Sequence, residues 1–128
     1  MKEPIWLQDA VVTVIHNRQL AEHGGLDGVR HPGMLSSALA SPKNAFAYSQ
    51  PKPDIRALAA AYAFGIIKNH PVVDGNKRTA YVLCRTFLIL NGQDINASDV
   101  DKYQTFLGVA DGTIDESQLG DWIRSRLA

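Results

Sequence analysis

The chain has 128 residues, a length at which one hydrophobic core is usual, so we expect a single domain over residues 1–128. Its 13 Lys and Arg residues balance 13 Asp and Glu residues, which argues against the basic footprint of a direct nucleic-acid binder. A single cysteine excludes an internal disulfide, and neither a signal peptide nor a membrane-spanning apolar run is recognisable, so we expect a cytoplasmic protein without a membrane partner.

Two helices are expected in the first third of the chain. Apolar side chains recur at helical spacing over residues 5–22, and Gly24 can supply the left-handed residue that ends this helix. Pro32 suits the first position of a short second helix over residues 32–40. The segment SPKN at residues 41–44 should end that helix, because proline lacks the N–H that an interior position donates.

Residues 45–49 hold Phe46 and Tyr48 two positions apart, a spacing that indicates a short strand or a packed surface loop.

Two long apolar helices follow, over residues 55–69 and 77–90. The second is apolar nearly all round, which is typical of a central buried helix. We expect Cys84 there to be a buried apolar residue and Arg85 to form an ion pair or to extend to solvent, although a phosphate contact is also open.

The last third predicts two further helices. Ser98 can begin a helix over residues 98–110, and Gly112 can end it. A final helix should start from Thr113 or from Asp115, which compete as caps, and run to about Leu127. The expected buried stripes are Val100, Tyr103, Phe106 and Leu107 in one helix and Leu119, Trp122, Ile123 and Leu127 in the other. The fold class is therefore all-α, with at most one small hairpin at residues 45–49.

The segment HPVVDGNKR at residues 70–78 joins the two long apolar helices. Pro71 biases His70 toward extended geometry, so the first helix should end near Asn69. Gly75 permits unusual backbone shapes, and the second helix should start near Asn76 or Lys77. The first N–H groups of a helix have no internal partner and lie at the positive end of its dipole, so this start suits an anion.

The side chains of this segment suit phosphate chemistry. Asn76, Lys77 and Arg78 offer an amide, an ammonium and a planar fork for phosphate oxygens. Asp74 is a hard oxygen ligand for a Mg²⁺ that also binds phosphates, and the imidazole of His70 titrates where a general base is needed. A plain connecting loop with capping residues is the alternative interpretation. The order of all five residues favours phosphoryl or nucleotidyl transfer.

This segment resembles the signature of the Fic/Doc family, H-x-F-x-(D/E)-(G/A)-N-(K/G)-R, with Val72 in place of the usual Phe. Lys77 is similar to the Doc branch, whose members are toxins of bacterial toxin–antitoxin pairs, whereas Pro71 and Gly75 are closer to the wider Fic pattern. The resemblance extends over nearly the whole chain, through His16 with the segment HGGL at residues 23–26 and through the segment PGML at residues 32–35.

The resemblance implies a Fic fold of about six helices around a central one, with residues 45–49 as the flap that aligns the target by strand addition. It implies transfer of the γ-phosphate of ATP, with Mg²⁺, to a Ser or Thr of the translation machinery, with elongation factor Tu as the target, which would inhibit translation. The implied catalytic residues are His70 and Arg78, the nucleotide-binding residues are Gly75, Asn76, Lys77 and Arg78, and the metal ligand is Asp74.

A Phd-like antitoxin is the implied partner, because the chain lacks the inhibitory Ser/Thr-x-x-x-Glu motif that many Fic proteins carry. Two alternatives stay open. A Fic-type nucleotidyltransferase would move AMP or UMP onto a protein hydroxyl instead of phosphate. A non-enzymatic helical interaction module could use the Lys77–Arg78 turn, although the chain has no recognisable helix-turn-helix. A metal hydrolase is disfavoured, since the other histidines show no ligand spacing with His70 and Asp74.

Overall fold

The computed structural model describes residues 3–23, 32–69 and 76–127, and these residues form helices with a single isolated antiparallel bridge between Ile95 and Leu127. The expected all-α class is confirmed. No helix among the described residues has the length and hydropathy that a bilayer crossing requires. The helices are α1 (Asp9–His23), α2 (Pro32–Tyr48), α3 (Ile55–Asn69), α4 (Asn76–Leu90), α5 (Asp99–Asp111) and α6 (Glu116–Ser125).

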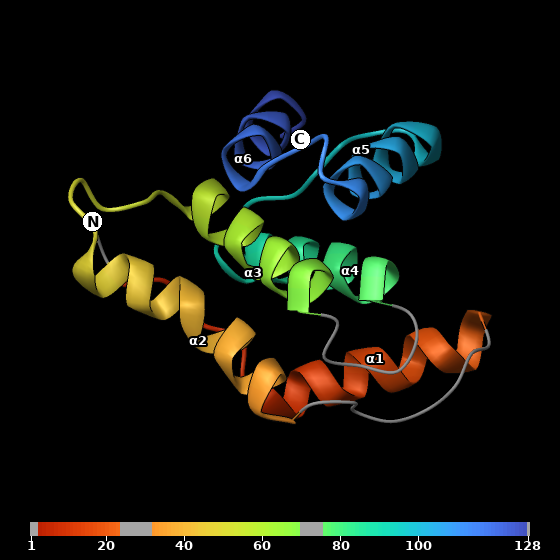
Figure 1. Cartoon of the computed structure of the whole chain (residues 1–128), viewed down its shortest axis with the longest axis horizontal. Helices are drawn as coiled ribbons and strands as arrows, with labels where there is room; N and C mark the ends of the chain where they lie inside the picture. The colour runs from red at the N-terminus through yellow and green to blue at the C-terminus, as the bar shows by residue number, and fades with distance from the viewer. Residues whose placement is uncertain (1–2, 24–31, 70–75, 128) are drawn as a thin grey trace.

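The helices are arranged in three layers, with α3 and α4 between a layer of α1 and α2 and a layer of α5 and α6 (Figure 1). The central helix is α3, which packs against α2, α4, α5 and α6. Every residue from Leu58 to Ala63 is buried, since the small alanines let neighbouring helices approach from several sides. Helix α4 lies beside α3 in this middle layer and buries most of its apolar side chains, as predicted for residues 77–90, while Ile89 and Leu90 at its end are exposed.

Helix α2 does not end at residue 40 but continues through Pro42 to Tyr48. Tertiary contacts on both sides of the proline hold the helix together against the loss of one backbone hydrogen bond. Before Pro42, Ala38 packs so closely on α3 that a Cβ at Gly65 would lie 3.3 Å from the Ala38 Cβ. After it, Phe46 packs edge-on against Trp6, with ring centroids 5.7 Å apart.

The predicted strand or flap at residues 45–49 was therefore wrong, since residues 45–48 form the last turn of α2. Phe46 is buried and Tyr48 is 84% exposed, so the two side chains do lie on opposite sides. Two helical residues at positions i and i+2 are about 200° apart around the axis, and two strand residues are 180° apart. A pair of aromatic residues at this spacing cannot distinguish the two structures.

Helix α1 begins at Asp9, and the expected start at residue 5 was wrong because side chains elsewhere bind the backbone of residues 5–7. The N–H of Ile5 donates to Asn91 Oδ1 at 2.8 Å, and Asn91 Nδ2 donates to the Ile5 carbonyl at 3.1 Å. The N–H of Leu7 donates to the Tyr62 hydroxyl at 3.2 Å. On α1 itself Val12 is buried but Val11 is exposed, so the apolar stripe is narrower than its sequence indicates.

Helix α5 starts and ends as predicted but turns a different face to the core. The N–H of Asp101 donates to Ser98 Oγ at 3.1 Å, and Gly112 closes the helix with a φ of 90°. The expected stripe was wrong at Val100 and Tyr103, each 65% exposed, and at Leu107, which is 38% exposed. Phe106 fixes the orientation of the helix through edge-on contacts with two aromatic rings, and its buried companions are Thr105, Gly108 and Val109.

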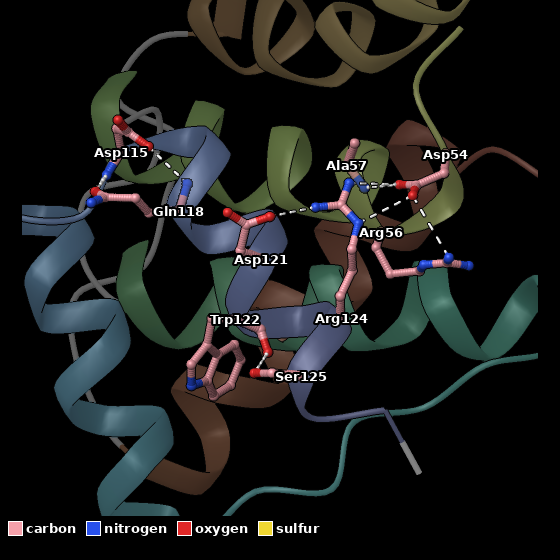
Figure 2. Close-up of polar contacts among 9 residues, drawn as sticks. All are labelled: Asp54, Arg56, Ala57, Asp115, Gln118, Asp121, Trp122, Arg124 and Ser125. Carbon is pink, nitrogen blue, oxygen red and sulfur yellow. Dashed lines mark hydrogen bonds and ion pairs between the residues drawn. The ribbon is translucent and has the colours of Figure 1, made fainter.

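Helix α6 takes Asp115 as its cap, the second of the two predicted candidates. Asp115 Oδ1 accepts from the Gln118 N–H at 2.8 Å, and Gln118 Oε1 accepts from the Asp115 N–H at 2.8 Å. Arg124 then ties α6 to the start of α3, because its guanidinium reaches Asp54 as well as Asp121 on its own helix (Figure 2). Leu119 and Ile123 are buried as expected, whereas Leu127 lies beyond the helix and is partly exposed.

Candidate active site

The two helices that flank the predicted site lie where the sequence places them. Helix α3 ends at Asn69 and α4 begins at Asn76, as the proline and glycine between them predict. The pair runs antiparallel, because the later residue of α3 meets the earlier of the two partners. The Tyr62 and Phe87 rings are 5.0 Å apart, while Arg56 Nη1 lies 3.5 Å from Oε1 of Gln93, which follows the C-terminal end of α4. The end of α3 and the start of α4 therefore lie at the same end of this helix pair (Figure 1).

The structure describes only part of the predicted site. His70, Asp74 and Gly75 lie outside the described residues, and so do the side chains of Asn76 and Lys77. Their roles as base, metal ligand and phosphate-binding groups stay predictions. The backbone of Asn76 and Lys77 and the whole of Arg78 are described, and all three belong to the first turn of α4.

This first turn has the properties of an anion-binding helix start. It carries no acidic side chain, so no carboxylate of the helix itself neutralises the positive end of the dipole. Arg78 is exposed, whereas Thr79 and Ala80, which follow it directly, are fully buried. The turn is thus fixed by its buried side and presents Arg78 at the surface. A phosphate at this position would meet both the terminal N–H groups and a guanidinium.

A contact that spacing did not predict lies behind this turn. His16 on α1 is 3% exposed, and its Nδ1 lies 3.2 Å from Oγ1 of Thr79 on α4, a hydrogen bond whose donor depends on the histidine tautomer. From the sequence, His16 belongs to the pattern that resembles the Fic/Doc family, and its spacing from His70 and Asp74 does not suit a shared metal ion. His16 and Thr79 are 63 positions apart, so no local sequence pattern could predict that their side chains are in contact.

Arg85 and Cys84, further along α4, have surroundings of their own. Arg85 donates to both carboxylate oxygens of Asp94, at 2.9 and 3.2 Å, so the expected ion pair is confirmed. Cys84 is fully buried, and this burial raises the pKa of its thiol to about 12, which rules out a thiolate nucleophile near neutral pH. Among the described residues no three His, Cys, Asp or Glu side chains gather into a metal site, and Asp74 falls outside that range.

Comparison with known proteins decides the family. The family model described as the Fic/DOC family matches residues 6–88. The chain belongs to the Fic/DOC family. The matched range holds α1 to α3 and all but the last two residues of α4, and thus both flanks of the segment at residues 70–75 together with His16, while α5 and α6 follow it.

Two Fic/DOC relatives show how similar this chain is to named members. It is 38% identical over 85 residues to the protein named toxin Doc of Mycolicibacterium smegmatis, and these residues make up 66% of this chain and 65% of that toxin. It is 28% identical over 110 residues to the protein named protein kinase doc of Escherichia phage P1, which covers 86% of each chain. The match to the first relative therefore spans just under two thirds of its length. The resemblance to the Doc branch is confirmed.

Proposed function

We propose that this protein is a Doc-type toxin that transfers the γ-phosphate of ATP to a Ser or Thr hydroxyl of another protein. The observation that carries the proposal is the start of α4 at Asn76, directly after the segment HPVVDG, with no acidic side chain in its first turn. Membership of the Fic/DOC family and similarity to proteins named toxin Doc and protein kinase doc support it.

The residues divide the reaction between proton removal and charge stabilisation. His70 takes the proton of the target hydroxyl as its oxygen bonds to the γ-phosphorus, and the bond from that phosphorus to the bridging oxygen breaks to release ADP. Lys77 and Arg78, with the Asn76 amide and the first N–H groups of α4, stabilise the charge on the phosphate oxygens. The carboxylate of Asp74 together with phosphate oxygens is a donor set that suits Mg²⁺, which when bound would neutralise further charge.

The proposed substrate is a protein of the translation machinery, with elongation factor Tu as the target that the Doc resemblance implies. Its modification would stop translation and hence growth of the host, in the cytoplasm where that machinery works. Inhibition would come from a Phd-like antitoxin bound along α1 and the face of the site, where Val11 and Val14 of α1 are exposed apolar residues. Expression of the wild-type chain alone should slow bacterial growth, and expression of His70→Ala should not.

Nucleotidyl transfer is the second candidate function, and Lys77 is the residue that argues against it. By resemblance, AMP-transferring relatives carry Gly at this position, which leaves room for the α-phosphate near the helix start. A lysine side chain occupies that space and adds a charge suited to a terminal phosphate.

Two radioactive labels distinguish these functions. The protein is incubated with a bacterial lysate and with ATP labelled at either the γ or the α position, and the labelled protein is identified by mass spectrometry. Label from the γ position alone, with the added mass of one phosphate, is the expected result. Label from the α position would replace the proposal with nucleotidyl transfer. His70→Ala is the control, and a general base contributes on the order of 10²–10⁴ in rate.

A further inference from the structure

Residues 5–23, which are α1 and the segment before it, are attached by polar contacts at the N-terminal end of α4 and just beyond its C-terminal end. Beyond the C-terminal end of α4, Asn91 forms the two hydrogen bonds with the backbone of Ile5 described above. At the N-terminal end, His16 Nδ1 lies 3.2 Å from Thr79 Oγ1. The two attachments differ in their distance from the site, since Asn91 is beyond the last turn of α4 and Thr79 directly follows Arg78.

The contact between His16 and Thr79 is buried on both sides. His16 is 3% exposed and Thr79 is fully buried, so water competes little with the bond between them. Threonine in a helix has two accessible χ1 rotamers, and the bond to an imidazole from another helix selects one of them. A buried hydrogen bond of this kind fixes the rotation and height of the first turn of α4 relative to α1.

We infer that His16 is a positioning residue for phosphoryl transfer, acting through Thr79 on the turn that carries Asn76, Lys77 and Arg78. The inference rests on the proposed function and adds a residue of α1 to the site. Transfer requires phosphate, base and target hydroxyl in one geometry, and a misplacement of about 1 Å can lower the rate about 10²-fold. Helices hold such a geometry when buried contacts lock their position.

The test uses conservative substitutions at both ends of the bond in the full-length protein. Thr79→Val keeps the shape of the side chain and removes the hydroxyl, whereas Thr79→Ser keeps the hydroxyl. His16→Phe removes the ring nitrogens, whereas His16→Asn keeps a hydrogen-bonding group near the position of Nδ1. Asn91→Ala is the matched control, because it removes the attachment of the α1 segment at the opposite end of α4.

Steady-state phosphorylation of the target and thermal unfolding are measured for every variant. Thr79→Val and His16→Phe should each lower kcat at least tenfold, and the double variant should lose no more than either alone, because both remove one shared bond. Thr79→Ser and His16→Asn should recover most of kcat. Asn91→Ala should lower the unfolding temperature and leave kcat within about twofold of wild type. Unchanged kcat in Thr79→Val, or losses that multiply in the double variant, would overturn the inference.

A measurement without substrate separates this inference from the proposed function. Amide hydrogen exchange is followed at Ala80 and Tyr81, the first α4 residues whose N–H groups bond within the helix. Exchange there should be at least tenfold faster in Thr79→Val and His16→Phe, and unchanged in Asn91→Ala. Equal exchange in all variants would contradict the positioning role. If wild type transfers no phosphate but these amides respond as expected, the proposed function fails and the role of His16 in ordering the turn stands.

Discussion

Arg78 and Arg85 both belong to α4, Arg78 to its first turn and Arg85 to a later turn. The guanidinium of Arg85 is held by both oxygens of Asp94, and this hydrogen bond lowers the pKa of Asp94 below its usual value. Arg78 belongs to the first turn of α4, and its side chain is exposed. Arg85 is thus held in an ion pair, whereas binding of a phosphate is proposed for Arg78.

The same substitution at the two arginines should thus have different effects. Arg78→Lys should weaken ATP binding at least severalfold, because an ammonium lacks the bidentate fork, and Arg78→Ala should weaken it further. Arg85→Lys should leave ATP affinity unchanged. Calorimetric titration with and without Mg²⁺ measures these affinities, and Asp74→Asn should abolish the difference that Mg²⁺ makes. Equal affinities for Arg78→Lys and Arg85→Lys would argue against the phosphate site.

Cys84 should be chemically silent in the folded protein. Its thiol is fully buried, and burial raises its pKa to about 12, so thiolate is scarce at pH 8. A thiol reagent such as dithionitrobenzoate should label the native protein only at the rate of unfolding and label it at once in denaturant. Rapid labelling of the native protein would show that α4 opens locally.

At the scale of elements, the starts and ends of helices followed from local sequence, whereas their faces did not. Ser98, Asp115 and Gly112 act as predicted because capping needs only the residue and its immediate neighbours. The buried face of α5 depends on the rings that meet Phe106, and the start of α1 depends on Asn91 and Tyr62. These partners are far away in the sequence, so no local pattern could reveal them.

In the candidate site, too, features that depend on neighbouring residues could be predicted, and a contact between distant residues could not. The motif at residues 70–78 and its place between two helices were readable from the sequence, since both rest on neighbouring residues. The link from His16 to Thr79 was not readable, because it joins two helices whose packing the sequence alone did not fix.

The start of α3 should make stability depend on pH. Partial burial alone would raise the pKa of Asp54, but hydrogen bonds from Arg124 and from the Ala57 N–H outweigh it and lower the pKa below its usual value. The unfolded chain then binds a proton at higher pH than the folded one, so this stabilisation is present above about pH 5 and is lost as the pH falls through the folded pKa. Asp54→Asn should reduce the drop in urea midpoint between pH 6 and pH 3. An unchanged drop would assign the acid sensitivity to other carboxylates.

At the scale of the whole molecule, α3 is the element through which the layers depend on one another. It contacts α2 on one side and α5 and α6 on the other, and its alanines leave little space for adjustment. A substitution that removes a buried side chain from a helix packed on α3 should therefore lower the stability of the whole fold. A substitution on an outward face should have a smaller effect.

Two leucine substitutions in the outer layer test this difference. Leu119→Ala in α6 removes a fully buried side chain and should lower the free energy of unfolding by about 2–5 kcal/mol. Leu107→Ala in α5 is the matched control, since this leucine is 38% exposed and should cost clearly less. Urea unfolding followed by circular dichroism measures both. Similar losses would show that the outward face of α5 is covered in solution.

The hydrogen bonds between Ile5 and Asn91 join residues 86 positions apart in the sequence. During synthesis they can therefore form only after most of the chain has been made. The residues of α1 emerge first, yet Thr79 and Asn91, to which the α1 segment attaches, are synthesised only after α2 and α3. Chains are synthesised from the N-terminus at about 5–20 residues per second. The residues of α1 are therefore present for several seconds before Thr79 and Asn91 exist to bind them. A nascent chain therefore completes this side of the site late in its own synthesis.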